Sequence, residues 1–302
     1  MKRNFNFYLS IIVILCTTGC SHSPASTPDM PTEVKVTGQL QSDILDEVSG
    51  VAVSTHFPDI LYVHNDSGDS SRFFAINPTG KLVCTYDFKG LLQNGLGVQD
   101  CEDIAIGAGP VEGQSYIYLA DIGDNDAKRT SVQVYRMAEP QLHDGVVFVE
   151  ADVLNLHYPD HARDAETILI DPVERMLYIL SKREDSAAIF RTSLDFQDHE
   201  NRQLEKSGKI FLEGSGAQKW IVSGDISADG SGILLKTVAS VYYWKRNPNE
   251  GVTMTLQKQP VKQIAYQVNG QEEAISFTPD DNGYYILSEG RGSRIYDYTL
   301  VK

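Results

Sequence analysis

One short phrase recurs five times along the chain, and this repetition constrains the fold more than any other feature. Each copy sets polar or acidic residues just before an apolar strand, and a second, aromatic-rich strand and then a third strand follow. Such repeats, with alternating apolar residues and turns of Gly, Asp and Asn, are typical of β-sheet arrays and propellers. The copies are EVSGVAVS from Glu47, DCEDIAIG from Asp100, DAETILID from Asp164, IVSGDISADG from Ile221 and QEEAISFTPD from Gln271.

The spacing of the copies predicts an all-β fold, a five-bladed β-propeller. One apolar residue in each copy serves as a marker, and successive markers lie 53, 64, 58 and 49 residues apart, about the size of a four-stranded blade. A six-bladed ring is the alternative, and it requires one blade without a visible phrase. The markers are Val51, Ile104, Ile168, Ile226 and Ile275.

A segment before the first phrase can close the ring. It reads VKVTGQL, and we expect it to supply the outer strand of the last blade. Closure is favoured because an open array leaves unpaired strand edges. We therefore expect residues 33–302 to form a single propeller domain.

The beginning of the chain resembles an export signal. Lys2 and Arg3 precede an apolar stretch that is too short to cross a bilayer as a helix. The sequence TTGC ending at Cys20 resembles the bacterial lipobox, in which the cysteine is acylated and becomes the mature N-terminus. We expect a lipoprotein signal peptide over residues 1–19. Ordinary secretory cleavage and an uncleaved anchor are the alternatives.

The next residues have the composition of a tether. Residues 20–32 are rich in Ser, Pro and Thr without apolar periodicity, which is typical of a flexible linker. Ser21 follows the cysteine, and by resemblance to lipoprotein sorting this favours the outer membrane. We expect an exported protein, attached through its lipid alone, that faces the periplasm or the cell surface.

The charge of the chain excludes one class of partner. The formal net charge is −15, from 41 acidic and 26 basic residues, which disfavours binding to nucleic acid or to an anionic membrane surface. A bound cation fits this negative charge better.

The predicted body contains Cys84 and Cys101, which an oxidising compartment would allow to pair. The sequence does not decide whether this disulfide forms.

The repeated phrase also predicts a metal site. In a propeller the innermost strand of each blade lines the central tunnel, and the residue two places before the marker should face it. Three or more carboxylates around a narrow tunnel must take up protons, find basic partners or share a cation. Ca²⁺ accepts an irregular shell of oxygen ligands, whereas Mg²⁺ demands octahedral geometry. The facing residues are Ser49, Glu102, Glu166 and Glu273, with Ser223 or Asp225 beside Gly224 in the fourth copy.

The order of these residues resembles that of two families of five-bladed propellers, the SdiA-regulated bacterial propellers and, more distantly, the calcium-activated nucleotidases (apyrases). The phrases NDSGD, EDIA, ADIGDN and DAE are also similar to those of secreted bacterial propeller lipoproteins. In the nucleotidases the matching positions bind Ca²⁺ in the tunnel. The resemblance therefore implies a Ca²⁺ held by Ser49, Glu102, Glu166, Ser223 and Glu273.

A second set of residues should surround one opening of the tunnel. The second strand of each blade returns to the face on which the inner strand begins, and the loops on such faces usually carry function. Basic residues there fit an anionic or polar ligand, with carboxylates opposite. The predicted ligand-binding residues are Asn65, Asp66, Asp121, Asp124, Lys182, Arg183, Glu289 and Arg291.

Two functions agree with these features. The first is a Ca²⁺-binding scaffold of the cell envelope that binds a polar or anionic small molecule, a glycan or an envelope protein. The second is a Ca²⁺-dependent hydrolase of phosphate esters or anhydrides, in which the metal polarises a phosphoryl oxygen. The sequence shows no GxSxG, HExxH or P-loop motif, so no catalytic residue is assigned and enzymatic activity is left open.

Overall fold

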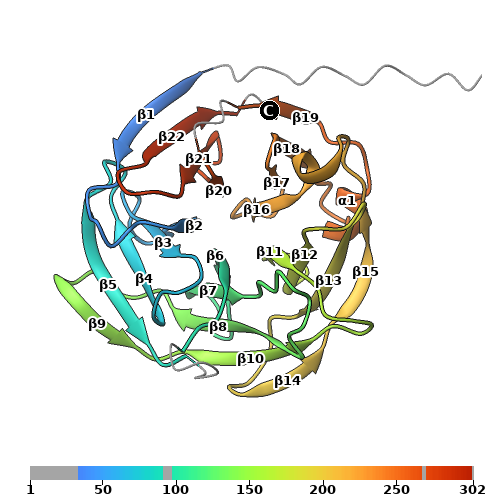
Figure 1. The fold of residues 1–302 in the computed structure, drawn as a ribbon, viewed down its shortest axis with the longest axis horizontal. Coiled ribbons are helices and arrows are strands. Elements are labelled where there is room, and N and C mark those ends of the chain that lie inside the picture. The colour runs from blue at the N-terminus through green and yellow to red at the C-terminus, as the bar shows by residue number, and fades with distance from the viewer. Residues whose placement is uncertain (1–32, 91–96, 267–269, 301–302) are drawn as a thin grey trace, which may run out of the picture.

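Five β-sheets surround a central axis and form a five-bladed propeller (Figure 1). The structure is a computed structural model, and it describes residues 33–90, 97–266 and 270–300. The predicted signal peptide, Cys20 and the tether lie outside the described residues. The five sheets confirm the all-β class and the predicted number of blades. The inner strands begin at the repeated phrases.

The first two blades each carry a fifth strand that the sequence pattern did not reveal. Each joins the edge of its sheet in parallel orientation, β9 against β5 and β14 against β10. Blade 1 consists of β2 (Val48–Val53), β3 (Leu61–Asn65), β4 (Arg72–Ile76), β5 (Leu82–Phe88) and β9 (Gly145–Val149). Blade 2 consists of β6 (Cys101–Ala108), β7 (Ser115–Asp121), β8 (Val132–Ala138), β10 (Asp152–His157) and β14 (Glu200–Gln203).

The other three blades have four strands each. Blade 3 consists of β11 (Ala165–Asp171), β12 (Met176–Ser181), β13 (Ala187–Ser193) and β15 (Glu205–Ile210). Blade 4 consists of β16 (Ile221–Ile226), β17 (Gly232–Thr237), β18 (Ser240–Lys245) and β19 (Lys262–Ala265). Blade 5 consists of β20 (Glu272–Phe277), β21 (Gly283–Ser288), β22 (Arg294–Thr299) and β1 (Val34–Gln39). A 3₁₀ turn (Gly216–Lys219) precedes blade 4, and the short helix α1 (Val252–Leu256) lies between β18 and β19.

The ring closes as the sequence predicts. The first described strand, β1, pairs antiparallel with β22, from Val34 opposite Tyr298 to Gln39 opposite Arg294 (Figure 1). The outer strand of the last blade therefore comes from the beginning of the propeller sequence. This pairing ties the two ends of the fold together and covers an edge that would otherwise lack hydrogen-bond partners.

The hydrophobic core lies between neighbouring blades. Ile168 of blade 3 belongs to the same buried cluster as Tyr118 of blade 2, and Leu169 belongs to a cluster with Trp244 of blade 4. Successive residues of one inner strand thus face opposite neighbours, as the alternation of a β-strand requires. The structure leaves Cys84 and Cys101, which are both buried, as free cysteines.

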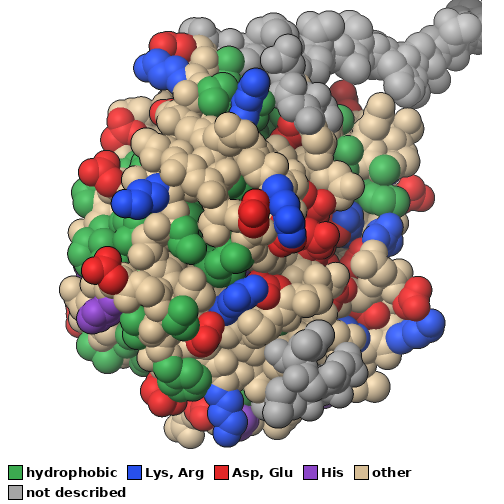
Figure 2. Space-filling view, turned by 60° about the vertical axis from the view of Figure 1, so that its left-hand side comes forward, with side chains coloured by type: hydrophobic (Ala, Val, Ile, Leu, Met, Phe, Trp, Pro, Cys, Tyr) green, Lys and Arg blue, Asp and Glu red, His purple; other side chains and the backbone are tan. Residues whose placement is uncertain are grey.

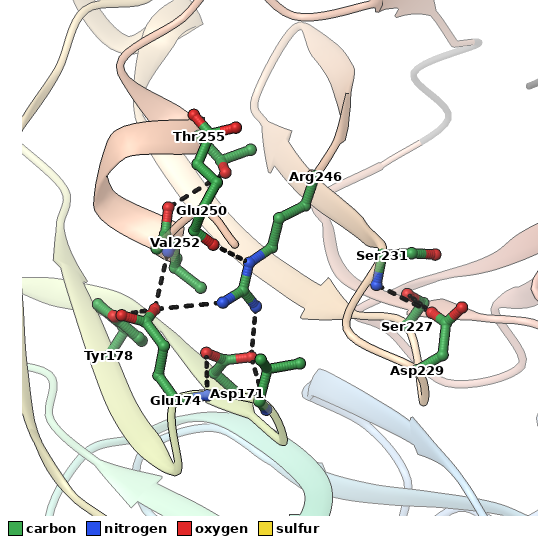
Figure 3. A network of polar contacts seen from close by, with 12 residues as sticks. Asp171, Glu174, Tyr178, Ser227, Asp229, Ser231, Arg246, Glu250, Val252 and Thr255 are labelled. Atoms are coloured by element: carbon green, nitrogen blue, oxygen red, sulfur yellow. Dashed lines mark hydrogen bonds and ion pairs between the residues drawn. The ribbon is translucent and has the colours of Figure 1, made fainter. Parts of the chain in front are cut away.

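A buried arginine joins blades 3 and 4 (Figure 3). Arg246, which follows β18, contacts Asp171 at the end of β11 with an N–O distance of 2.6 Å and Glu174 with one of 3.4 Å. Glu174 also accepts a hydrogen bond from the backbone N–H of Val252, at the start of α1. Because Asp171 is fully buried, its charge depends on this arginine for compensation.

In the described part of the chain, no helix is long and apolar enough to cross a membrane.

Candidate metal and ligand site at the tunnel mouth

Each inner strand has a break in register at its beginning, inside the repeated phrase. The strand ladder skips one residue in every blade before regular pairing resumes. Such a β-bulge changes the direction of the side chain that it carries. The five skipped residues occupy equivalent positions around one end of the tunnel, which we call the mouth. They are Ser49, Glu102, Glu166, Val222 and Glu273.

In blade 4, the register of the inner strand differs from the register that the sequence predicts. Its bulge is at Val222, and the next residue, Ser223, pairs with Lys236 as Gly50 pairs with His64 in blade 1. Ser223 therefore belongs one layer deeper, where its hydroxyl donates to Asp103 (3.2 Å). Neither Ser223 nor Asp225 stands at the bulge position, so blade 4 presents an apolar side chain there.

The Asp225 carboxylate lies still further along the tunnel. It accepts hydrogen bonds from the hydroxyl of Ser276 (2.8 Å) and from the backbone N–H of Phe277 (2.9 Å). It also lines a cavity at the opposite end of the inner strands. Ser49, in contrast, is the skipped residue of blade 1 at the mouth, and its hydroxyl donates to the backbone carbonyl of Glu102 (3.1 Å).

Carboxylates from four blades form a continuous group at the mouth, which we call the acidic arc. It consists of three overlapping clusters, in each of which carboxylate oxygens lie within 4.8 Å of one another. The clusters share Asp66 and Glu102, and so they connect blade 5 to blade 3 through blades 1 and 2. In the space-filling view, acidic side chains gather in a hollow of the surface with Lys and Arg side chains beside them (Figure 2). The arc consists of Glu289, Glu273, Asp66, Asp100, Glu102, Asp164 and Glu166.

The innermost cluster of the arc is buried and only partly compensated. All three of its residues, Glu102, Asp164 and Glu166, are at most 5% exposed. Lys182 binds one oxygen of Glu166, and Arg183 contacts Asp164 with an N–O distance of 2.6 Å. The second carboxylate oxygen of Glu166, Oε2, is buried without a hydrogen-bond partner. A buried carboxylate oxygen without a donor is costly, and a bound cation would remove that cost.

Two members of the arc were missed by the sequence reasoning. Asp100 and Asp164 stand two residues before Glu102 and Glu166, at the very start of their phrases. The bulge is at the second residue of each pair, and both carboxylates lie at the same opening. The signal was present as a second acidic position in both phrases, but the prediction used only the position two places before the marker.

The arc raises the pKa of several of its own carboxyl groups. Burial, together with the charges of neighbouring carboxylates, raises the pKa of Asp66 and of Asp100 to about 6. The pKa of Glu102 lies well above its usual range, through burial first and then through Asp66 and Asp100. Burial and the charge of Glu273 raise the pKa of Glu289 to about 8. In the absence of a cation, the arc therefore holds protons at neutral pH.

A glycine accommodates the close approach of the carboxylates. A Cβ atom placed on Gly123 would lie within 2.5 Å of the carboxylates of Glu102 and Asp100. The backbone N–H of Gly123 donates to the carbonyl of Asp100 (3.1 Å), which holds the loop after β7 against the start of β6. Any larger residue at this position would push the arc apart.

The residues expected around the mouth divide into two groups. Asp66, Lys182, Arg183 and Glu289 reach the arc as described above. Others have partners outside the arc. The Asn65 side chain donates to the carbonyl of Ile44 (2.7 Å).

The remaining predicted rim residues also have partners outside the arc. Asp121 pairs with Arg129 at an N–O distance of 2.7 Å in a buried environment, and Asp124 accepts a hydrogen bond from the backbone N–H of Arg129 (2.7 Å). Arg291 pairs with Asp46 at 3.3 Å on the exposed surface. These residues shape the loops and do not belong to the arc.

Blade 4 gives the mouth a different chemical character on its side. Trp220 occupies the position that Asp100 and Asp164 hold in blades 2 and 3, and the guanidinium of Arg183 lies 4.8 Å from the centre of its ring. Lys236 is fully buried and donates to the hydroxyl of Tyr266 (2.7 Å); burial lowers its pKa to about 7. The mouth therefore combines an acidic arc with a basic and aromatic side.

Comparisons with known proteins add little beyond the fold. No family model matches the chain, and no curated protein sequence matches it. A solved structure similar to the chain is that of a Bacteroides fragilis protein provisionally named a 6-phosphogluconolactonase, with 15% identity and a TM-score of 0.42. The similar region covers 80% of this chain and 64% of that protein. The resemblance to the SdiA-regulated propellers and the nucleotidases stays a prediction, and a likeness at this level says nothing about activity.

Proposed function

We propose that the propeller binds a Ca²⁺ ion at the inner cluster of the acidic arc, formed by Glu102, Asp164 and Glu166. The observation that carries this proposal is the buried oxygen of Glu166 that has no partner, within a group of three buried carboxylates. Carboxylates are hard oxygen ligands that suit Ca²⁺, and the uneven ring of donors fits its tolerance of irregular shells. Binding would also compensate the repulsion that raises the pKa of the arc.

The ion would be one half of a site for a polar or anionic ligand. Lys182 and Arg183 contact the same carboxylates that would hold the ion. Once the ion compensates those carboxylates, both cations become available to an anionic group beside it. Trp220 offers a flat apolar surface next to Arg183. We propose this role for a protein of the cell envelope that is attached through a lipid at Cys20.

Hydrolysis of a phosphate ester or anhydride is the second candidate. Its specific support is the pair Asp66 and Asp100, two carboxylates that stand beside the proposed metal ligands and could act as a general base. Both lie in a cluster that shares Glu102 with the inner one. A metal ion there could polarise a phosphoryl oxygen while one of these carboxylates accepts a proton from water.

Calorimetric titration with Ca²⁺ tests the metal site. The protein stripped of metal should bind Ca²⁺ and release protons, because the arc gives up those that it holds. Glu166→Gln should weaken binding at least tenfold. Glu112→Gln, which changes an exposed residue far from the arc, should leave binding unchanged and serves as the matched control.

An activity screen separates the two functions. A panel of nucleotides and phosphomonoesters is incubated with the Ca²⁺-loaded protein. Turnover that is lost in Asp100→Asn and that requires Ca²⁺ would favour the hydrolase. Ca²⁺ binding without any turnover favours the scaffold, and equal Ca²⁺ binding by the wild-type protein and Glu166→Gln would refute the assigned metal site.

A further inference from the structure

The tunnel has a second opening with a cavity of its own, which we call the lower cavity. It has a volume of about 680 Å³ and is lined by the final residues of all five inner strands. None of the residues of the acidic arc lines it. Its size falls within the range of about 300–1,000 Å³ that is typical of sites for small organic molecules.

A ring of apolar side chains forms the inner wall of the lower cavity. Counted from the register after each bulge, one residue from every blade occupies the same position, three places beyond Gly50 and its equivalents. All five are large aliphatic or aromatic residues, and all five line the cavity. They are Val53, Ile106, Ile170, Ile226 and Phe277. The cavity therefore offers a continuous apolar surface to the body of a ligand.

One carboxylate interrupts this apolar wall. Asp225 stands where the other inner strands have Ala52, Ala105, Leu169 and Ser276, and it lines the cavity. Its oxygens accept hydrogen bonds from Ser276 and from the backbone N–H groups of Ile226 and Phe277. These bonds hold the carboxylate in place.

The rest of the polar lining consists of Ser, Thr, Gln, His and Asp side chains. Among the described residues the lining includes Asp281, at a positive φ of 56°, and it includes neither Lys nor Arg. His56 lines the cavity with its ring 3.2 Å from the buried carboxylate of Glu139. Glu139 also accepts hydrogen bonds from Ser54 and Thr55. The surroundings thus favour a positive ligand over a negative one.

The two ends of the tunnel are separate sites. The fully buried carboxylate of Asp103 reaches from blade 2 to the backbone N–H of Ile168 in blade 3 (3.0 Å) and to the hydroxyl of Ser223 in blade 4 (3.2 Å). In register, Asp103 lies between the bulge residues and the apolar ring. A ligand in the lower cavity therefore has no contact with the acidic arc.

We propose that the lower cavity binds a small organic cation, an amine with an apolar body, whose ammonium group pairs with Asp225. The apolar ring contacts the body of the ligand, and the carboxylate selects its charge. This site is independent of the Ca²⁺ site at the mouth. It gives the propeller two ligand-binding ends of different chemistry.

Three probes of similar size and different charge test the proposal on the Ca²⁺-saturated protein: 4-ethylbenzylamine, 4-ethylbenzyl alcohol and 4-ethylbenzoate. Binding is followed by titration calorimetry and by ligand-observed NMR. We expect the amine to bind at least tenfold more tightly than either the alcohol or the benzoate. Saturation with Ca²⁺ prevents the amine from occupying the acidic arc. Equal affinities for the three probes, or no binding of the amine at millimolar concentration, would overturn the proposal.

Three variants locate the bound amine. Asp225→Asn should reduce amine affinity to that of the alcohol, and Ala108→Trp, which fills the cavity from its edge, should abolish binding of all three probes. Asp46→Asn serves as the control at the other end, because the exposed pair of Asp46 with Arg291 lies outside both sites, and it should leave amine binding unchanged. Loss of amine binding in Asp46→Asn, or retention in Ala108→Trp, would show that the amine binds elsewhere. The comparison of probes on the wild-type protein stands even where Asp225→Asn fails to fold.

Discussion

Acidification should destabilise this propeller through one buried histidine. His64 is fully buried in β3, its Nδ1 atom lies 2.8 Å from the carbonyl of Asn65, and its Nε2 atom is buried without a partner. Burial lowers its pKa from 6.5 to about 4. The unfolded chain takes up a proton at this residue below about pH 6.5, whereas the folded chain resists it, so stability falls as the pH decreases from 6.5 toward 4.

The magnitude follows from the difference between the two pKa values. At 1.36 kcal/mol per pKa unit, the folded state should lose about 3 kcal/mol between pH 7.5 and pH 4 through this residue. His64→Leu removes the effect and suits the position, because Leu180 and Leu287 occupy it in blades 3 and 5. Other titrating groups, including the acidic arc, are shared by both proteins and cancel in the comparison.

Urea denaturation of both proteins across this pH range measures the effect. The wild-type protein should lose about 3 kcal/mol of unfolding free energy relative to His64→Leu as the pH falls from 7.5 to 4. A difference between the two proteins that does not change with pH would refute the account of a neutral, buried His64.

Three further predictions concern the arc and the blade interface. The raised pKa values of the arc, about 6 for two of its aspartates and about 8 for one glutamate, mean that the folded state binds more protons than the unfolded state. In the His64→Leu background, which removes the opposite trend of the histidine, the metal-free protein should therefore lose thermal stability as the pH rises from 5 to 8, and saturating Ca²⁺ should flatten this trend; a metal-free His64→Leu protein that gains stability over that range contradicts it. Arg246→Met should lower the unfolding free energy by about 3–5 kcal/mol, because it leaves the charge of Asp171 buried and uncompensated; denaturant titration checks this, and a loss below about 1 kcal/mol would speak against a buried ion pair. Gly123→Ala should weaken Ca²⁺ binding about tenfold, since the added Cβ collides with the Glu102 carboxylate; unchanged affinity in calorimetry would place the ion elsewhere.

The architecture of the protein was accessible from its sequence because every blade repeats the same physical pattern. The inner strands begin at the repeated phrases, and the VKVTGQL segment closes the ring as β1. The two additional strands were not found. In β9, Val146 and Phe148 are 67% and 59% exposed, so a short edge strand of this kind lacks the burial pattern that marks the others.

The details of the site depend on register, which the phrase alone does not reveal. The structure brings Glu102, Glu166 and Glu273 to the mouth, because each precedes its marker at the same distance; their role as metal ligands stays a prediction. In blade 4, the sequence Gly224-Asp225-Ile226 resembles the end of the repeated phrase in the other copies, and the marker was therefore set at Ile226. Strand pairing instead puts the bulge at Val222. A shift of one or two residues along a strand moves a side chain to another face or another layer, and this is why Asp225 lines the lower cavity.

The metal content of the purified protein tests the central claim most directly. We predict a tightly held Ca²⁺ in each chain by elemental analysis. Chelation should remove it and lower the melting temperature, and added Ca²⁺ should restore that temperature more completely than Mg²⁺. A protein that contains no metal, and whose melting temperature responds to neither chelator nor Ca²⁺, would contradict a metal site at the tunnel mouth.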